Sequence, residues 1–239
     1  MYYCVRMNNK ESDVPCNLRD CLLCRLCLPD WIPAVEIHRK NFLLKKGQRV
    51  FREGEPVTGI YFVYSGVAKI HKKWGLEKEL IIRFAGAGDI MGHLGLGKEA
   101  RYPVSATAVE STKVCYLDMD FFESTLRVNS NLTYTLMRFL ADELQESHRG
   151  MRNLAHMSVK ARTAQALVSL KKQFGTKPNG AIAAIISRQD IASFAGTTYE
   201  TLFKMLNDLT VEGCIRLDGK SITILNEDKL RAIIQIDSQ

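Results

Sequence analysis

Residues 186–206 read Ile186-Ser-Arg-Gln-Asp-Ile-Ala-Ser-Phe-Ala-Gly-Thr-Thr-Tyr-Glu-Thr-Leu-Phe-Lys-Met-Leu206, and they contain the starts of two helices. The segment Ser187-Arg-Gln-Asp190 forms a capping box that opens the first helix. Gly196 makes the turn, and Thr197 or Thr198 caps the second helix. Two helices joined by a short glycine-containing turn are typical of a helix-turn-helix.

The residues around this stretch add β-structure. Gly213 ends the second helix, and residues 181–186 are expected to form a short strand before the first. Asp218-Gly219 is a strong two-residue hairpin signal between the apolar runs 215–217 and 221–225. A hairpin that follows the second helix indicates a winged helix-turn-helix.

The second helix has one apolar face. Its core-facing residues at helical spacing are Leu202, Met205, Leu206 and Leu209. Residues near the start of a recognition helix contact base edges, and those facing outward here are Tyr199, Glu200, Phe203 and Lys204. Glu200 can accept from a cytosine amino group, and Lys204 can donate to guanine. Phosphate contacts are expected from Ser187, Arg188, Thr197 and Thr198. The alternative is an ordinary solvated helix face.

Strand-like patterns fill residues 47–117. Gly59-Ile-Tyr-Phe-Val-Tyr-Ser-Gly66 is a β-rich apolar run, and Leu80, Ile82 and Phe84 alternate with less apolar positions. Glycine turn signals recur between the runs. Short strands at such spacing predict an antiparallel barrel or sandwich.

A long helix follows. Asn129-Ser-Asn131 offers N-caps, and the next apolar residues lie near one face of a helix of about 27 residues, or roughly 40 Å. Ser147 interrupts this stripe. A narrow apolar seam on so long a helix predicts pairing with a second copy of the chain; the expected dimer residues are Leu136, Leu140, Leu144 and Met151. The alternative is a helix lying on its own barrel. A further helix is expected over residues 159–174.

The overall composition limits the classes of function that the chain can have. The chain of 239 residues carries a net charge of +7, which favours a polyanionic partner. The sequence contains no apolar run of the roughly 18 residues that a membrane helix needs, and residues 1–16 lack a signal-peptide core. We therefore expect a cytoplasmic protein with reduced thiols and no membrane partner. No catalytic His/Asp/Ser constellation stands out, so an enzyme is not expected.

These residues resemble the CRP/FNR family of bacterial transcription regulators. Residues 186–206 look like its helix-turn-helix signature, and Gly47…Phe51-Arg-Glu-Gly54 with residues 61–66 resembles its double-stranded β-roll. The resemblance spans about residues 40–230 and implies a homodimer on a two-fold-related double-stranded DNA operator, with RNA polymerase as a further partner. The family often has Arg where this chain has Lys204 and a small residue where it has Phe203, while Glu200 matches.

The expected fold class is therefore α+β, with a cyclic-nucleotide-binding-like jelly roll, a long dimerisation helix and a C-terminal winged helix-turn-helix. The expected domains are a cysteine-rich segment at 1–32, a sensory β-roll at 33–126, the dimerisation helix at 127–157 and the DNA-binding domain at 158–239.

Two segments indicate whether the chain can bind cyclic AMP. Family members that bind it use a Gly-Glu-Leu segment for the ribose and an Arg-Ser-Ala segment for the phosphate; the matching segments here are Gly92-His93-Leu94 and Val104-Ser105-Ala106. A desolvated cyclic phosphate needs a cation or a dense donor set, and Val104 supplies neither. Cyclic AMP is not expected as an effector.

The cysteines suggest another signal. Cys16-x4-Cys21-x2-Cys24-x2-Cys27 places four thiols within a short segment, a spacing that suits an iron–sulfur or zinc site. Val114-Cys115-Tyr116 resembles the remote ligand site of the oxygen-sensing FNR branch. The resemblance implies a [4Fe-4S] cluster on Cys21, Cys24, Cys27 and Cys115, with Cys16 as an alternate ligand, degraded by oxygen or nitric oxide. That branch separates its last two N-terminal ligands by five residues, whereas Cys24 and Cys27 are separated by two.

Several alternatives stay open at this point. The N-terminal thiols can form a self-contained site without Cys115, can bind zinc, or can be unliganded in a mobile arm. The chain can also be a CRP-like regulator of another small effector without a metal, or an iron–sulfur or zinc protein that does not act on DNA. In the favoured mechanism, an intact cluster orders the N-terminal segment against the roll and the base of the long helix and promotes dimer pairing.

Overall fold

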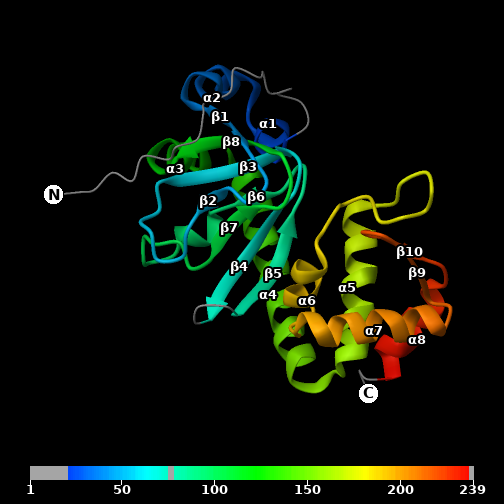
Figure 1. Ribbon diagram of the computed structural model, residues 1–239. Helices are drawn as coiled ribbons and strands as arrows, with labels where there is room; N and C mark the ends of the chain where they lie inside the picture. The colour runs from blue at the N-terminus through cyan, green and yellow to red at the C-terminus, as the bar shows by residue number, and fades with distance from the viewer. Residues whose placement is uncertain (1–20, 75–77, 237–239) are drawn as a thin grey trace. The chain divides into compact units, whose positions relative to one another are not determined.

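The computed structural model describes residues 21–74 and 78–236, which form two compact units (Figure 1). Among the described residues, the first unit comprises 21–69 and Ala85–Met137, and the second comprises 70–74, 78–84 and 138–236. The hairpin 70–84 thus groups with the C-terminal part of the chain, and the long helix is divided between the units.

The strands form two four-stranded sheets, as expected for the β-roll. One has the order β1-β8-β3-β6 and the other the order β2-β7-β4-β5. Their bounds are β1 Lys40–Leu44, β2 Arg49–Phe51, β3 Gly59–Ser65, β4 Ala68–Trp74, β5 Lys78–Ala85, β6 Ile90–Met91, β7 Ser105–Ala108 and β8 Thr112–Asp118. The pairs of β3 and β8 are antiparallel, with Phe62 opposite Cys115. The α+β class and the roll are confirmed.

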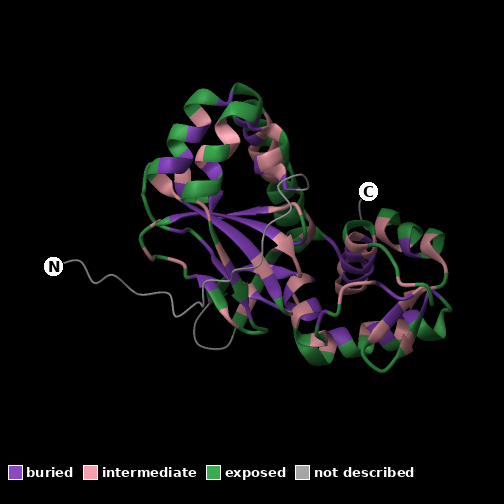
Figure 2. Ribbon diagram, turned by 90° about the horizontal axis from the view of Figure 1, so that it is seen from above, coloured by how far each residue is buried: buried purple, intermediate pink, exposed green. Residues whose placement is uncertain are grey.

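Aromatic side chains pack together inside the roll, whose strands are largely buried (Figure 2). The rings of Phe51 and Tyr102 stack with centroids 4.1 Å apart, and those of Tyr61 and Tyr116 lie 5.0 Å apart. The Tyr102 hydroxyl donates to the carbonyl of Gly59 at 2.8 Å and accepts from the amide of the same residue at 3.3 Å. Burial raises the pKa of Tyr61 far above its ordinary value, so this phenol is neutral.

A helical layer covers the β3–β8 face that is opposite to these tyrosines. It consists of α1 Leu22–Leu26, the 3-10 turn η1 Pro29–Trp31, α2 Ile32–His38 and α3 Met119–Val128. Phe62 packs on Phe122 of α3 with ring centroids 6.1 Å apart. The indole of Trp31 donates to Thr125 Oγ1 at 3.1 Å. Asn129 Oδ1 accepts from the amide of Leu28 at 2.6 Å, so the N-terminal segment is joined to the residue that precedes the long helix.

The long helix α4 spans Ser130–His156 and has the 27 residues expected from the sequence. Leu132 and Leu136 are buried within the protomer. The exposed leucine and methionine side chains are Met137, Leu144, Met151 and Leu154. With the half-buried Leu140 and with Ser147, they repeat at alternating intervals of three and four residues along one side of the helix. Leu136 is therefore not on the exposed stripe, because it is used in the protomer's own core.

The second unit contains four more helices and a hairpin. They are α5 Val159–Phe174, α6 Arg188–Phe194, α7 Tyr199–Val211, β9 Ile215–Asp218, β10 Ser221–Ile224 and α8 Glu227–Ile236. The strand expected over residues 181–186 is wrong: only isolated bridges from Ala181 to Thr223 and from Thr176 to Ile182 are present there. Asp218 pairs with Ser221, so the hairpin loop is Gly219-Lys220, one position later than expected.

The alternation expected over Leu80, Ile82 and Phe84 is only partly observed in β5, where Phe84 is buried but the other two residues are not. Ile81 is buried, whereas Leu80 and Ile82 are exposed to 37% and 44%. The outward-facing Leu80 lies close to the helix-turn-helix: its Cδ1 is 3.9 Å from the position that a Cβ would take on Gly196.

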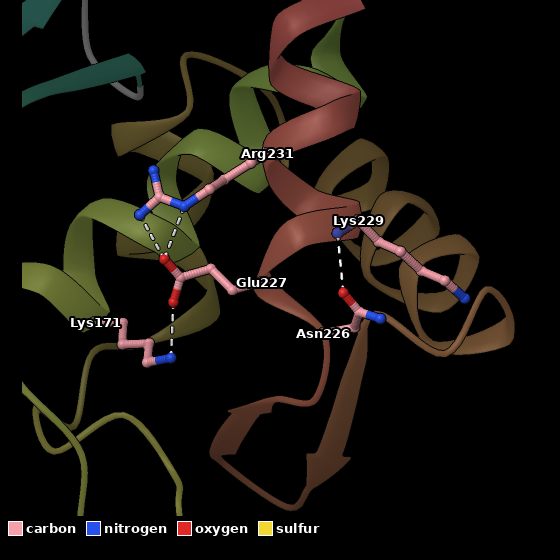
Figure 3. Close-up of polar contacts among 5 residues, drawn as sticks. All are labelled: Lys171, Asn226, Glu227, Lys229 and Arg231. Carbon is pink, nitrogen blue, oxygen red and sulfur yellow. Dashed lines mark hydrogen bonds and ion pairs between the residues drawn. The ribbon is translucent and has the colours of Figure 1, made fainter.

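The last helix is held to α5 by an ion-pair network (Figure 3). The carboxylate of Glu227, in the first turn of α8, pairs with Lys171 of α5 at 2.7 Å and with Arg231 one turn further along α8. Hydrogen bonds from these two cations lower the pKa of Glu227. Asn226 caps the helix by accepting from the amide of Lys229 at 3.0 Å.

Within the described residues, no helix is long and apolar enough to cross a bilayer.

Candidate nucleic-acid interface

Side-chain caps define both helices of the helix-turn-helix. Ser187 Oγ accepts from the amide of Asp190 at 3.0 Å and bonds to its carboxylate at 2.6 Å, as the capping box predicts. Of the two candidate threonines, Thr198 is the N-cap of α7 and accepts from the amide of Thr201 at 3.3 Å. Gly196 has φ +63 in the intervening turn, a left-handed conformation that favours glycine.

One face of α7 is buried and the other is exposed. Leu202, Leu206 and Leu209 are at most 1% exposed. The outward face begins in the first turn with Tyr199, which is 43% exposed, and continues with Phe203, which is 54% exposed. Glu200 and Lys204 lie beside them and are also exposed, whereas Thr197 is half-buried. The residues expected to contact base edges therefore form one continuous solvent-facing surface.

Arg188 has a structural contact that the sequence does not reveal. Its Nη2 donates to the carbonyls of Gly219 and Ser221 at 3.4 Å, so the first residue of α6 bonds to the tip of the β9–β10 hairpin. Burial lowers the pKa of this guanidinium. Arg188 thus supports the wing, whatever contact it makes with a phosphate.

Three of the candidate metal-binding cysteines lie on or next to α1. Cys21 and Cys27 flank this helix and are buried, and Cys24 is half-buried. The Cys21 sulfur accepts from the Cys24 amide at 3.4 Å. Burial, together with the nearby Cys21, raises the pKa of Cys27 to about 11. Cys16 lies outside the described residues.

The fourth candidate, Cys115, is buried on β8. Because it is paired with Phe62, its side chain is on the sheet face that the helical layer covers. The donors are chemically suited to a thiolate-ligated centre. Among the described residues, however, no three Cys, His, Asp or Glu side chains are gathered in an arrangement that could hold a metal ion. The four candidate cysteines that the structure describes therefore lie in the helical layer or directly under it, but they do not come together at one metal-binding site.

The segments that correspond to a cyclic-nucleotide site are largely buried, except for Leu94, which is 41% exposed. Val104 and Ser105 are 6% and 5% exposed, and Ser105 Oγ accepts from the amide of Glu53 at 3.0 Å. His93 begins the 3-10 turn η2 His93–Leu96 and is 2% exposed.

Two residues with a place in this architecture were not identified from the sequence. Met137 belongs to the exposed stripe of α4. Arg162 of α5 donates three hydrogen bonds to carbonyls of other segments, two of them more than 30 residues away. No local pattern marks such a long-range contact.

Comparisons with known proteins agree with the order of these parts. Residues 42–129 match the cyclic nucleotide-binding domain family, and residues 161–233 match the Crp-like helix-turn-helix domain family. A Mycobacterium tuberculosis protein described as a CRP-like cAMP-activated global transcriptional regulator is 30% identical over 187 residues, which cover 77% of this chain and 84% of that protein. The chain belongs to the CRP/FNR family.

Other relatives of this CRP/FNR member cover more of its length. The transcriptional activator protein anr of Pseudomonas aeruginosa is 30% identical over 223 residues, or 90% of this chain and 91% of the relative. The fumarate and nitrate reduction regulatory protein of Salmonella typhimurium is 26% identical over 224 residues, or 90% and 89%. The first is a transcriptional activator by name, and the second is a regulatory protein by name.

Solved structures share the fold. FixK2 from Bradyrhizobium japonicum superposes with a TM-score of 0.74 at 23% identity, covering 82% of this chain and 96% of FixK2. The CRP/FNR member described here is thus a DNA-binding transcription regulator by family.

Proposed function

We propose that this CRP/FNR-type regulator binds a two-fold-related DNA operator as a homodimer and responds to oxygen or nitric oxide through cysteine ligands. The observation that carries DNA recognition is the exposed face of α7, where Tyr199, Glu200, Phe203 and Lys204 project from a capped helix end beside a wing. A helix N-terminus of this kind presents side chains to base edges and free amides to phosphates.

Base recognition is assigned to the polar pair on this face. The Glu200 carboxylate can accept from a cytosine amino group, and Lys204 can donate to guanine as a point charge without the bidentate fork of arginine. Thr197, Thr198 and Ser187 are phosphate contacts through their hydroxyls and helix-terminal amides. Arg188 contributes by supporting the wing as well as by its charge.

Replacing Glu200 with alanine is expected to relax base preference. The loss of one good base contact should reduce discrimination at one operator position by about tenfold, while non-specific affinity rises slightly because a negative charge is removed. Binding to operator variants selected from a random duplex pool measures this. Asp208→Ala, which removes a carboxylate near the other end of the same helix, is the matched control and should leave selectivity unchanged. An E200A protein with wild-type selectivity would contradict the assigned role.

For the signal, we propose a [4Fe-4S] cluster with Cys21, Cys24, Cys27 and Cys115 as ligands, Cys16 being an alternate. The bound cluster supplies a centre that oxygen or nitric oxide degrades. The proposal is supported by the thiol spacing, by the placement of Cys115 under the helical layer, and by the resemblance of its neighbours to the oxygen-sensing branch. Since the described thiols are not gathered, the residues around α1 must move for the four to share one centre.

The chain's own contacts suggest how such movement reaches the long helix. Leu28 bonds to Asn129, and Trp31 bonds to Thr125, just after the last candidate ligand in the N-terminal segment. Asn129 in turn accepts from the amide of Thr133 through its carbonyl, in the first turn of α4. Repositioning α1 therefore strains or releases the base of α4. A few kcal/mol of differential stabilisation suffices to change operator occupancy strongly.

Substituting Cys115 with alanine is expected to remove most of the iron and acid-labile sulfide from anaerobically prepared protein, together with its visible absorption. Cys214→Ala is the control, because Cys214 is also buried but lies at the start of the wing. Iron and sulfide analysis beside a spectrum measures both variants. Full cluster content in C115A would eliminate this ligand and favour Cys16 or a self-contained N-terminal site. Zinc in place of iron and sulfide would replace the cluster proposal with a structural site.

Dimer formation is assigned to the exposed stripe of α4, with Met137, Leu144 and Met151 as its most exposed members. RNA polymerase is proposed as a partner on the family resemblance alone. We propose no cyclic AMP dependence, because Val104 offers no cation and the rings of Tyr102 and Tyr61 are packed inside the roll. A colourless anaerobic protein with full operator affinity would favour a regulator of another small effector.

A further inference from the structure

The junction between the long helix and the helix-turn-helix is built around one side chain, Arg162. This residue lies in the first turn of α5, immediately after the end of α4. Its Nη1 donates to the carbonyl of Met157 at 2.6 Å, its Nε to that of Ala195 at 2.9 Å, and its Nη2 to that of Gly196 at 3.3 Å. All three donor nitrogens of the guanidinium are therefore bonded to main-chain carbonyls.

These three carbonyls belong to different parts of the unit. Met157 follows the last residue of α4 and its amide closes that helix on the carbonyl of Asn153. Ala195 is the C-cap of α6, and Gly196 forms the turn that leads into α7. Carbonyls at the ends of helices lack partners within the helix and carry the negative end of its dipole, so they favour a cation. One guanidinium thus joins the C-terminal ends of two helices.

A direct packing contact accompanies these bonds. Gly196 lies so close to α4 that a Cβ built on it would be 2.4 Å from Cδ2 of Leu154. The turn of the helix-turn-helix is therefore held against the last turn of α4 by both packing and hydrogen bonds. Because α7 begins at Tyr199, only a few residues after Gly196, its direction depends on where this turn is fixed.

We propose that Arg162 is a positioning residue that fixes the direction of α7 relative to α4 and thereby sets the half-site spacing that a dimer accepts. The role requires arginine, because the planar fork presents several donors in fixed directions and a lysine ammonium does not. Arg162 does not need to touch DNA. The inference rests on the proposed binding of a dimer to a two-fold-related operator, but not on the identity of the signal.

The spacing requirement follows from duplex geometry. Inserting one base pair between half-sites rotates one of them by about 35° and moves it along the axis. A rigid dimer then engages only one half-site at a time and loses the gain from simultaneous binding, about 100-fold. A dimer whose recognition helices pivot freely tolerates the same insertion with little loss.

The test uses the full chain and the operator selected from a random duplex pool, in versions with the spacer shortened or lengthened by one and two base pairs. Wild-type protein is expected to prefer one spacing by about 100-fold. Arg162→Met, which keeps an unbranched apolar stem but removes the donors, is expected to reduce that preference to within about threefold while its affinity for an isolated half-site is unchanged. Arg162→Lys should show an intermediate preference.

The matched control is Arg152→Met, since Arg152 is an exposed arginine near the end of α4 whose guanidinium donates to its neighbour Asn153. It should keep the wild-type spacing preference. A purely structural role for Arg162 would lower affinity for every spacing by the same factor, and that result, or wild-type preference in R162M, would overturn the inference. If R162M fails to fold, R162K decides: an unchanged spacing preference in R162K refutes the role. Wild-type protein that selects no sequence at all would instead refute the proposed function.

Discussion

Leu144→Asp is expected to convert the protein from dimer to monomer and to reduce its operator affinity by about 100-fold, the gain that comes from linking two binding modules. Leu144 is 57% exposed near the middle of the apolar stripe on α4, where a two-fold pairing brings it close to its own counterpart. Two carboxylates would then face each other inside an apolar seam, and each would lose hydration without gaining a partner. Sedimentation and duplex titration of the same samples measure both effects.

The control for this substitution is Gln145→Asp, which adds the same charge at the adjacent exposed position off the stripe. It should stay dimeric and bind normally. A dimeric L144D protein would show that the dimer interface is elsewhere. The length of α4 could then no longer be explained by pairing of its apolar stripe. Monomeric L144D with full operator affinity would instead contradict the need for two recognition helices.

Leu202→Ala is expected to destabilise the winged helix-turn-helix by about 3 kcal/mol, because a large side chain is removed from a closely packed site. Leu202 is completely buried on the core-facing side of α7. The loss should appear as a lower free energy of unfolding in denaturant and, at physiological temperature, as reduced operator binding by a partly unfolded domain.

Val211→Ala provides the comparison on the same helix. Val211 is 89% exposed, so its truncation should change the free energy of unfolding by about 0.5 kcal/mol or less. Equal effects at the two positions would mean that α7 is rotated from the orientation described. Such a rotation would bury Glu200 or Lys204 and remove the basis for their contacts with bases.

The elements set by local chemistry were the ones that the sequence predicted well. The caps at Ser187 and Thr198 and the stop at Gly175 need only nearby residues, and each helix bound that depended on them is confirmed. The length of α4 also agrees with its local apolar spacing, but the side chain of Asn129 bonds to Leu28 and Thr125 and does not cap this helix.

Features that depend on tertiary packing were predicted less well. Leu136 and Met137 are both apolar neighbours on one helix, and only the rest of the fold decides that the first is buried and the second exposed. Leu80 and Ile82 of β5 are exposed although Phe84 in the same alternating set is buried, and only the packing of the surrounding elements decides this difference. The hairpin loop moved by one residue because pairing of Asp218 with Ser221 fixes the register.

The candidate sites show the same difference between features set by local sequence and features set by tertiary packing. The exposed face of α7 followed from helical spacing, and the structure keeps it intact. The bonds of Arg188 to the wing and of Arg162 to the junction connect residues that are distant in sequence, so no local motif predicts them. The four cysteine ligands stay a prediction, because the spacing indicates which thiols can bind one cluster but not whether the folded protein brings them together.

The rings of Phe51, Tyr102, Tyr61 and Tyr116 are buried together inside the β-roll. The hydroxyls of Tyr102 and Tyr116 donate to the main-chain carbonyls of Gly59 and Thr58, so a small molecule that displaced these rings would also break those hydrogen bonds. In the proposed mechanism, the signal would instead reach the long helix through the first helices, whose segment bonds to Asn129 and Thr125.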